Sequence, residues 1–427
     1  MKTLFVFYND IQVGHLRVED NHQYSFLYHK SWVESDLAFS LSCSLPLPEV
    51  EKADIALPHD VSYSFFSNLI PEGDLRDKLA MQLGVSEKND FGLLEVVGGD
   101  VAGAISLYPS ADLPENIKNT KHRAKSLNEA DLLFVLDKLK THPFLVNTEE
   151  FNNGEQLRLS LAGAQNKLPI IFDDEQGFSL PLGKTASTHI LKPDNEHITG
   201  LVINEAFCMK LAKACGLPTA EVQLIQVKEQ IILLVKRYDR ENGQRLHQED
   251  FCQALGIVPF NKYESEGGPG FADCRTIIDQ YSQRPAADKK TLLQWTLFNY
   301  LIGNADAHGK NISLLYQPTP KLAPFYDLIC TAIYPSLTDR LSMKIGGENR
   351  PEWIMQRHWL RYGETLGVSE KMLKREADKL IKNIKREANN LQQTDLFANV
   401  TDKPLSAILT LIEKRSAWLL KRLSEEL

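Results

Sequence analysis

The sequence predicts an α+β protein with a small β-rich N-terminal domain, a β-rich small lobe that contains one helix, and an all-helical large lobe. Three patterns support this: two alternating strand segments around a short turn near the start, further strand segments between about residues 158 and 239, and helical periodicity after residue 244. We place the N-terminal domain at 1–110, a linker and helix at 111–150, the small lobe at 151–243 and the large lobe at 244–427. A chain of 427 residues suits two or three domains.

The composition is that of a globular protein, with 43% hydrophobic and 24% charged residues. The formal net charge of −8 means that contact with nucleic acid would need a local basic face or a basic partner. Six cysteines without a Cys-x-x-Cys pair indicate reduced thiols. The first apolar run, Leu4–Tyr8, is shorter than a secretory signal, and no stretch approaches the ~20 apolar residues of a membrane helix. We therefore expect a cytoplasmic protein without membrane contact.

The N-terminal domain should begin with a β-hairpin. Leu4–Tyr8 and Ile11–Val18 alternate in polarity on either side of Asn9-Asp10, which has acceptable turn chemistry. A helix is predicted over Leu75–Leu83, and the glycine-rich segment Val97–Leu107 is predicted to be a strand that closes the domain.

The following elements are predicted in chain order. The polar segment 110–125 is predicted to be a linker, followed by a helix near Glu129–Lys140. The helix Val202–Cys215 precedes Gly216, a residue type that commonly ends helices. The predicted strands of the small lobe are Leu168–Phe172, Thr188–Lys192 and Ile231–Lys236, and the predicted helices of the large lobe include Gln294–Ile302, Leu373–Ile384 and Ser406–Leu423.

A strand-rich lobe followed by a helical lobe is the layout of bilobal kinases, and one loop has matching chemistry. Asp306 and Asn311 have the D-x-x-x-x-N spacing of a kinase catalytic loop, in which a carboxylate accepts a hydroxyl proton and an amide oxygen binds magnesium. Asp327 follows Phe325-Tyr326 and would complete an all-oxygen magnesium site. Taken alone, the same residues also suit a polar loop in which Asp306 caps a helix, and a surface aspartate after a strand.

Two upstream segments are candidates for phosphate binding. Lys192 ends a predicted strand, as does the kinase lysine that contacts the α- and β-phosphates, and Glu205 in the next helix could pair with it. The segment Leu159–Lys167 contains small residues that would let backbone N–H groups approach phosphates, although it matches no standard phosphate-loop motif. The literal Asp90-Phe91-Gly92 lies more than two hundred residues before Asp306, so we interpret it as a turn in the first domain.

Five motifs in order resemble the HipA family of serine/threonine protein kinases over nearly the whole chain. Ser160–Lys167 is similar to the family's S-[IVL]-[AP]-G-[AV]-Q-x-K segment. His247–Gln253, with Lys262-Tyr263-Glu264 and Gly267–Gly270, resembles the family's hallmark stretch. The Asp306–Asn311 loop and Phe325-Tyr326-Asp327 follow in family order. The N-terminal domain is similar in Asn68–Gly73 and Gly98–Ala104.

The resemblance implies a role for each matching residue. Asp306 would be the catalytic base, Asn311 and Asp327 would bind Mg²⁺, and Ser160 would be autophosphorylated, which silences the enzyme. Lys236 departs from the family, in which the first hinge position is often acidic; hinge contacts are largely made by backbone, so we expect ATP binding to survive. The residues expected to bind ATP are Ala162, Gly163, Ala164, Gln165, Asn166 and Lys167 over the phosphates, Lys192 on the phosphates, Lys236, Arg237 and Tyr238 in the adenine-side hinge, and His308, Gly309, Lys310, Asn311, Tyr326 and Asp327 around the catalytic loop.

The same resemblance implies a toxin of a toxin–antitoxin pair that uses ATP and Mg²⁺ and arrests translation and growth. Its partner would be a HipB-like helix-turn-helix antitoxin, which carries the complex to operator DNA and represses transcription there. By family analogy its protein substrate would be a glutamyl-tRNA synthetase. The basic segment Lys371–Arg386 could contact DNA phosphates, or it could be an ordinary amphipathic helix with a solvated face.

Two other functions remain open from the sequence. A small-molecule or lipid kinase would share the Asp306–Asn311 loop, but it would have no need of the N-terminal domain around Phe65–Gly73. A catalytically idle co-repressor would have no need of intact Asp306, Asn311 or Asp327. An autophosphorylation assay separates the idle protein from the kinase.

Overall fold

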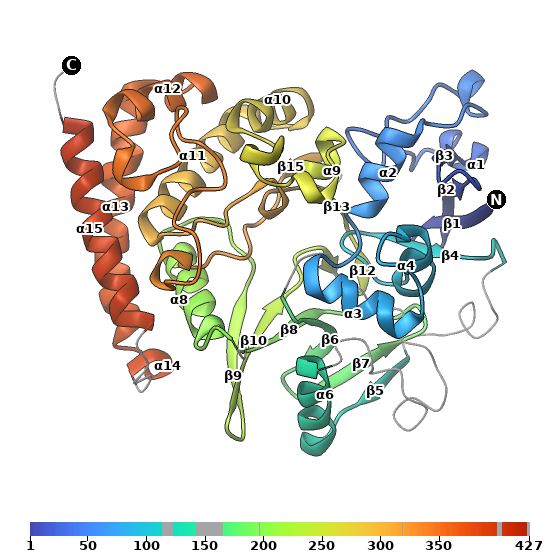
Figure 1. Cartoon of the computed structure of the whole chain (residues 1–427), viewed down its shortest axis with the longest axis horizontal. Helices are drawn as coiled ribbons and strands as arrows, with labels where there is room; N and C mark the ends of the chain where they lie inside the picture. The colour runs from blue at the N-terminus through green and yellow to red at the C-terminus, as the bar shows by residue number, and fades with distance from the viewer. Residues whose placement is uncertain (113–122, 142–164, 196, 318, 399–403, 425–427) are drawn as a thin grey trace. The chain divides into compact units, whose positions relative to one another are not determined.

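The computed structural model describes residues 1–427 except for 113–122, 142–164, 196, 318, 399–403 and 425–427 (Figure 1). The chain packs into two compact units, which we describe separately. The first unit comprises Met1–Pro193, Gln226–Phe260 and Leu315–Gln317, and the second comprises Asp194–Ile225, Asn261–Leu314 and Pro318–Leu427.

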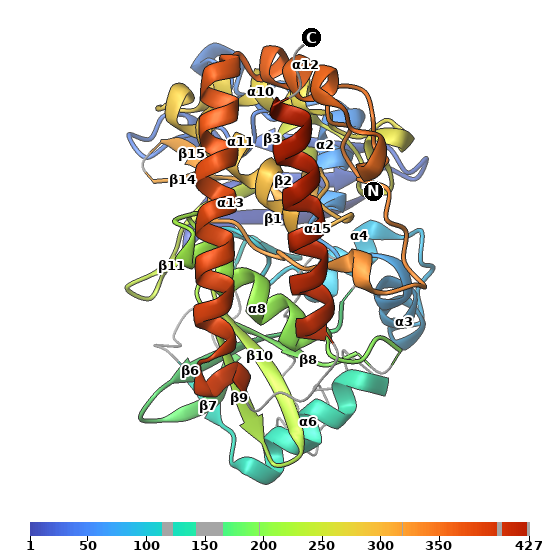
Figure 2. The ribbon, with the colours of Figure 1, turned by 90° about the vertical axis from the view of Figure 1, so that its left-hand side faces the viewer.

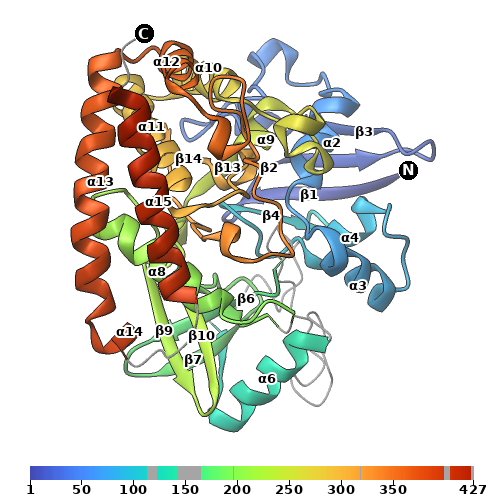
Figure 3. The same cartoon turned by 60° about the vertical axis from the view of Figure 1, so that its left-hand side comes forward.

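The first unit begins with a four-stranded antiparallel sheet of order β3-β2-β1-β4. The predicted hairpin is confirmed, and Asn9 in its turn has a φ of 52°, a left-handed conformation that asparagine tolerates. Alternate side chains of β1, such as Leu4 and Val6, are fully buried and form the core with α2 (His59–Ser67), which packs on β3 (Figure 3). The strands are β1 (Lys2–Tyr8), β2 (Ile11–Val18), β3 (Tyr24–Tyr28) and β4 (Ile105–Tyr108).

Beyond the hairpin, one further prediction for this domain is confirmed and two are wrong. Helix α3 (Gly73–Leu83) confirms the predicted helix. The predicted strand Val97–Leu107 is instead the end of helix α4 (Asp90–Val97), an irregular loop, and the start of β4. The predicted turn Asp90-Phe91-Gly92 is the first turn of α4, because the Asn89 side chain accepts a hydrogen bond from the Gly92 N–H at 3.0 Å and caps the helix.

Five strands of the small-lobe sheet lie entirely in the first unit, in the order β5-β7-β6-β8-β10. The predicted strands are confirmed as β6 (Leu168–Asp173), β8 (His189–Pro193) and β10 (Gln230–Lys236). Strands β5 (Arg123–Ser126) and β7 (Gly177–Leu182) were not predicted, and β5 begins within the expected linker. The predicted helix after the linker is confirmed as α6 (Glu129–Thr141).

The second unit is mainly helical. Helix α11 (Pro285–Ile302) packs against α13 (Glu370–Gln392) and α15 (Pro404–Ser424), which run alongside each other (Figure 2). The buried residues of α13 recur at helical spacing, for example Leu373, Ala377 and Leu380, so this helix buries one apolar stripe. These helices confirm the predicted ones, as does α8 (Leu201–Ala214). The remaining long helices are α10 (Phe271–Tyr281) and α12 (Gln356–Leu366).

Short elements interrupt the helices after residue 244, where an all-helical lobe was expected. Helix α9 (Phe251–Leu255) begins at Asp250, whose side chain accepts a hydrogen bond from the Gln253 N–H. The short strands of this region are β12 (Gln244–Arg245), β13 (His247–Asp250), β14 (Ser313–Tyr316) and β15 (Pro320–Leu322).

All six cysteines lie in the described part of the chain and none forms a disulfide, as predicted for reduced thiols. Among the described residues, no cluster of three or more His, Cys, Asp or Glu side chains could hold a metal ion. The described helices include none with the length and apolar character that crossing a membrane requires.

Candidate active site

The loop that carries Asp306 is delivered by the buried helix α11. The helix ends at Gly303, which has a φ of 80° and donates its N–H to the Asn299 carbonyl at 3.0 Å. This positive φ favours glycine, and a Cβ at this position would also displace the end of the Leu411 side chain. The chain therefore leaves the core abruptly and enters the catalytic-loop segment.

The Asp306 side chain lies at the surface of the second unit, with 54% of its area exposed. Its carboxylate accepts a hydrogen bond from the Tyr263 hydroxyl at 2.9 Å, and its backbone N–H donates to Asn304 Oδ1 at 3.0 Å. The next helical turn, η5 (Gly309–Asn311), has His308 as its N-cap residue, so the alternative of Asp306 as a helix cap does not hold. A half-exposed carboxylate with a fixed backbone can meet a substrate hydroxyl.

Asn304 is a site residue that the sequence did not single out. Its side chain is 2% exposed and donates to Asn299 Oδ1 at 2.8 Å and to the Asp327 carbonyl at 3.5 Å, while its Oδ1 accepts from the Asp306 N–H. One buried amide therefore ties the segments of Asp306 and Asp327 to the end of α11. In the sequence it is one polar residue after an apolar helix, and nothing in that pattern shows which groups it would join.

The segments of Asn311 and Asp327 also lie together. The Tyr326 hydroxyl donates to the Lys310 carbonyl at 2.7 Å. Asn311 and Asp327 each follow one of these two residues in sequence, so this hydrogen bond holds their segments next to each other. Asn311 is 7% exposed, and its Oδ1 accepts from the His308 N–H at 3.3 Å. Asp327 has a φ of 53°, a left-handed conformation that aspartate adopts more readily than most residues. One amide oxygen and one carboxylate suit Mg²⁺, which keeps several water or phosphate ligands.

In the first unit, Lys192 lies in β8, an interior strand between β6 and β10, opposite Leu233. It is only 5% exposed, and lysine is rarely so buried unless its ammonium group interacts with a polar or charged partner. Gln165, Asn166 and Lys167 lead into β6 and are half-buried. Ser160, Ala162, Gly163 and Ala164 lie outside the described residues. Glu205 is 2% exposed in α8 of the second unit, and its pairing with Lys192 stays a prediction.

The expected hinge follows β10. Lys236 is exposed at the end of the strand, and the Arg237 N–H donates to the Thr188 carbonyl at 3.0 Å. The Tyr238 hydroxyl donates to Gln248 Oε1, and Gln248 Nε2 donates to Asp239 Oδ2 at 3.4 Å. The hinge aromatic is thus connected to a buried carboxylate.

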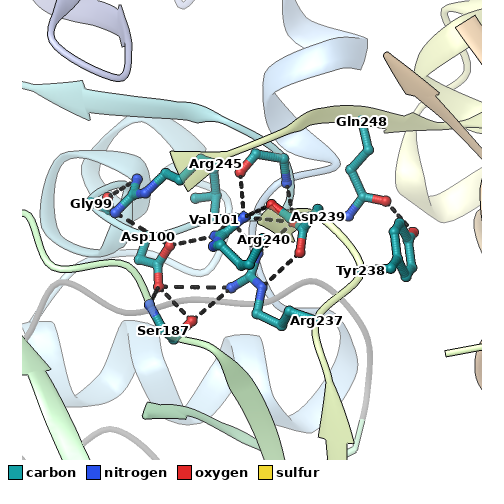
Figure 4. Close-up of polar contacts among 11 residues, drawn as sticks. Gly99, Asp100, Val101, Ser187, Arg237, Tyr238, Asp239, Arg240, Arg245 and Gln248 are labelled. Atoms are coloured by element: carbon teal, nitrogen blue, oxygen red, sulfur yellow. Dashed lines mark hydrogen bonds and ion pairs between the residues drawn. The ribbon is translucent and has the colours of Figure 1, made fainter. Parts of the chain in front are cut away.

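A buried ion-pair network surrounds this hinge (Figure 4). Arg237 donates to Asp239 at 2.7 Å, and Arg240 pairs with Asp100 at 2.7 Å and with Asp239 at 2.9 Å. Asp100 also accepts from Ser187 Oγ at 2.7 Å. Burial alone would raise the pKa of the Asp100 carboxyl, but the three guanidinium groups of Arg245, Arg240 and Arg237 outweigh it and hold that pKa well below its usual range.

Backbone carbonyls of the loop between α4 and β4 accept hydrogen bonds from the arginines of this network. The carbonyl of Gly99 accepts from Arg245 and that of Val101 from Arg237, both at 2.9 Å (Figure 4). The carbonyl of Gly103 accepts from Arg240 at 3.0 Å. These carbonyls point at guanidinium groups instead of a neighbouring strand, which is why the predicted strand does not form there.

Comparisons with known proteins show which proteins this chain is similar to. Two family models match: the HipA N-terminal domain over residues 4–108 and the HipA-like C-terminal domain over residues 159–390. The protein Y4mE of Sinorhizobium fredii is 39% identical over 89% of this chain and 90% of its own length. The serine/threonine-protein kinase toxin HipA of Shewanella oneidensis is 33% identical over 92% of this chain and 88% of its own length.

A solved structure is similar over the full length. In the complex of Shewanella oneidensis HipA, HipB and operator DNA, a chain with 28% sequence identity superimposes with a TM-score of 0.79, covering 99% of this chain and all of that one.

Proposed function

The chain belongs to the HipA family of serine/threonine-protein kinases, and from this premise we propose that it transfers the γ-phosphoryl group of ATP to a protein serine with Asp306 as the base. The observation that carries the proposal is the half-exposed Asp306 carboxylate, which accepts a hydrogen bond from Tyr263, while Asn304 holds the backbone N–H of the same residue. A base so placed can accept the proton of a serine hydroxyl while the oxygen attacks phosphorus.

We propose that Asn311 and Asp327 bind Mg²⁺ together with the nucleotide. When bound, the ion neutralises charge on the phosphates. The Tyr326–Lys310 hydrogen bond keeps the two segments that carry these ligands adjacent. His308, Gly309 and Lys310 complete the loop, where the Lys310 ammonium would stabilise the transferring phosphoryl group.

We propose that Lys192 contacts the phosphates, under a cover formed by Ala162–Lys167, and that Lys236, Arg237 and Tyr238 form the adenine-side hinge. The position of Lys192 supports this: it lies in the interior strand β8 and is 5% exposed, as expected of a strand lysine that contacts the α- and β-phosphates. Within the hinge, the Arg237 side chain is engaged by Asp239 and Asp100, so Arg237 would contribute through its backbone and its neighbours.

We further propose that the protein acts as the kinase toxin of a HipBA-type pair and binds a HipB-like antitoxin, which supplies most of the contact with operator DNA. The solved Shewanella oneidensis complex contains HipA, HipB and operator DNA, and the formal charge of −8 here suits DNA contact through a partner. A glutamyl-tRNA synthetase is the proposed substrate, by analogy with the family.

The experiment that tests this proposal is phosphotransfer by the purified full chain. Incubation with γ-labelled ATP and Mg²⁺ should label the protein, and mass spectrometry should find the phosphate on Ser160. The Ser160→Ala variant should lose that label. A phosphoserine carries about −1.5 to −2 charges at pH 7, so the phosphorylated form should bind ATP poorly if the loop also cradles phosphates. Absence of any label from the folded wild-type protein would favour the idle co-repressor.

A further inference from the structure

Tyr263 contacts the proposed base directly, from a different part of the second unit. Its hydroxyl donates to Asp306 Oδ1 at 2.9 Å. Its ring also lies edge-on to the buried His308 ring, with centroids 5.3 Å apart and an interplanar angle of 78°. The side chain therefore has both a polar and an aromatic contact with the catalytic loop, although it is 43 residues away in sequence.

The backbone of Tyr263 is anchored in a tight turn. Its carbonyl accepts hydrogen bonds from the N–H groups of Glu266 and Gly268, both at 2.9 Å. A Cβ at Gly268 would lie 2.2 Å from the Asn261 carbonyl oxygen and 2.7 Å from that of Tyr263, so only glycine fits there. The turn leaves little freedom for the residue that carries the phenol.

A second anchor joins this turn to the residue before Asp306. The Glu264 N–H donates to the Ser342 carbonyl at 3.2 Å, and Ser342 donates to the Ala305 carbonyl from its N–H at 3.0 Å and from its hydroxyl at 2.6 Å. The Glu264 carboxylate accepts from the Lys344 N–H at 2.5 Å. The neighbours of Tyr263 and of Asp306 are thus held to one shared segment.

We infer that Tyr263 is a positioning residue for phosphoryl transfer, which holds Oδ1 of Asp306 so that the second carboxylate oxygen faces the substrate hydroxyl. An aspartate carboxylate has two oxygens and can accept several hydrogen bonds, so one phenol leaves capacity for the substrate. Asn304 holds only the backbone N–H of Asp306, and His308 Nε2 lies 3.8 Å from Asp306 Oδ1, beyond hydrogen-bond distance. Among the described contacts of the carboxylate, the hydrogen bond is therefore the one from Tyr263. This inference rests on the proposed function of Asp306.

The opposite role would be a gate, in which the phenol occupies the place of the substrate hydroxyl and must leave before reaction. The two anchors argue against it, because a gate needs a side chain on a segment that can move. The two roles predict opposite effects when the hydroxyl is removed.

The test uses the Tyr263→Phe variant of the full chain, which keeps the ring against His308 and removes only the donor. We expect the maximal autophosphorylation rate at saturating Mg-ATP to fall about tenfold, since small misplacements of a catalytic group can lower rates by up to roughly a hundredfold. The ATP concentration for half-maximal rate should stay within about twofold, because the phenol contacts the base and makes no proposed contact with the nucleotide. A merely structural role would not produce this split.

Tyr362→Phe is the matched control. Its hydroxyl donates to Thr296 Oγ1 at 2.6 Å in the core of the same unit, so the variant loses a phenol hydrogen bond without touching Asp306. Its maximal rate should equal the wild-type rate at a temperature where both variants are folded. A Tyr263→Phe protein with an unchanged or higher maximal rate, or with only its ATP half-saturation altered, overturns the inference.

Asp306→Asn, measured alongside, separates this inference from the proposal on which it rests. If Asp306→Asn is inactive and Tyr263→Phe is as active as the wild type, only the positioning role fails. If Asp306→Asn retains the wild-type rate, the base assignment fails, and the role of Tyr263 fails with it.

Discussion

The carboxylate of Asp100 lies 3.7 Å from the guanidinium of Arg237, and the two side chains are at most 3% exposed. Asp100 belongs to the loop between α4 and β4 of the N-terminal domain, and Arg237 follows the last strand of the small lobe. Arg237 also pairs with Asp239, which is connected through Gln248 to Tyr238. The N-terminal domain therefore takes part in holding the segment that we propose as the nucleotide hinge.

Asp100→Asn should weaken both the fold and nucleotide binding. Removing one charge from a buried network leaves arginines without a counter-charge, which typically costs about 3–5 kcal/mol. We expect denaturant titration to show that the free energy of unfolding falls by that amount. Calorimetry under native conditions should show weaker ATP binding, because Arg237 in the hinge loses its ion pair with Asp100.

Asp90→Asn provides the comparison for this prediction. Asp90 forms a buried ion pair with Arg76 in the same domain, with side-chain exposures of 1% and 7%, and neither side chain belongs to the ion-pair network described around the hinge segment. It should lower the free energy of unfolding to a similar extent and leave ATP affinity unchanged. If both variants lower ATP affinity equally, the effect is general destabilisation and not a coupling through Asp100.

Lys192→Met should weaken ATP binding while preserving the strand. Methionine keeps most of the volume and removes the charge, and charge-assisted hydrogen bonds contribute about 1.5–3 kcal/mol, or roughly 10- to 100-fold in affinity. Isothermal titration with ATP measures the change. Lys184→Met is the control, because Lys184 pairs with Asp10 at 2.7 Å near the surface. Equal ATP affinity in both variants would mean that the nucleotide binds elsewhere.

Asp327→Asn should raise the Mg²⁺ concentration needed for half-maximal phosphotransfer. Asparagine tolerates the φ of 53° at this position, so the variant removes a carboxylate charge without adding backbone strain. We expect an increase of at least roughly tenfold, the scale on which changes near a metal alter its affinity. Asp339→Asn, an exposed aspartate in the same unit, should leave the Mg²⁺ dependence unchanged. An unaltered Mg²⁺ requirement in Asp327→Asn would remove this residue from the metal site.

The stability of the protein should fall in mild acid because of His247. Its ring Nε2 donates to the Leu41 carbonyl at 2.7 Å, and its buried Nδ1 has no hydrogen-bond partner among the described residues. Burial lowers the pKa of His247 to about 4. The unfolded chain therefore binds a proton below about pH 6.5 that the folded chain does not accept until about pH 4, so stability is lost across that window.

The size of this effect is about 3 kcal/mol between pH 7 and pH 4, at 1.36 kcal/mol for each pH unit of the window. His247→Gln keeps a donor near the Leu41 carbonyl and cannot titrate, so its unfolding free energy should fall less steeply over that range. Urea titrations at several pH values measure the difference. Parallel pH profiles of the two proteins would show that His247 is not responsible.

Periodic patterns in the sequence were sufficient for the long elements of the fold. Strands β1 and β2 bury alternate side chains over much of their length, and α13 buries a regular stripe, so the local polarity pattern predicts these elements. Helix α11 is buried on nearly all sides from Leu292 to Ile302, and its long apolar run predicts it. The loop from Gly98 to Ala104 was predicted to be a strand because its apolar and glycine residues resemble one. Its carbonyls instead accept hydrogen bonds from arginines more than 130 residues away, which the local sequence does not show.

The candidate site was only partly predictable for a similar reason. Spacing and family resemblance pointed to Asp306, Asn311 and Asp327, since each lies in a short local motif. The parts played by Asn304 and Tyr263 arise from hydrogen bonds between segments that are distant in sequence, so no local pattern contained them. Tyr263 belongs to the Lys262-Tyr263-Glu264 motif that resembles the family, but only the folded chain shows its contact with Asp306.

The measurement that tests the central claim most directly is phosphate incorporation by the Asp306→Asn variant. Asparagine keeps the shape of the side chain and removes its basicity, and loss of a general base typically lowers rates by ~10²–10⁴. We predict that the purified variant melts at the wild-type temperature and binds ATP, yet shows no detectable autophosphorylation over the time in which the wild-type protein is fully labelled. Phosphotransfer at the wild-type rate by the folded variant would contradict the assignment of Asp306 as the base.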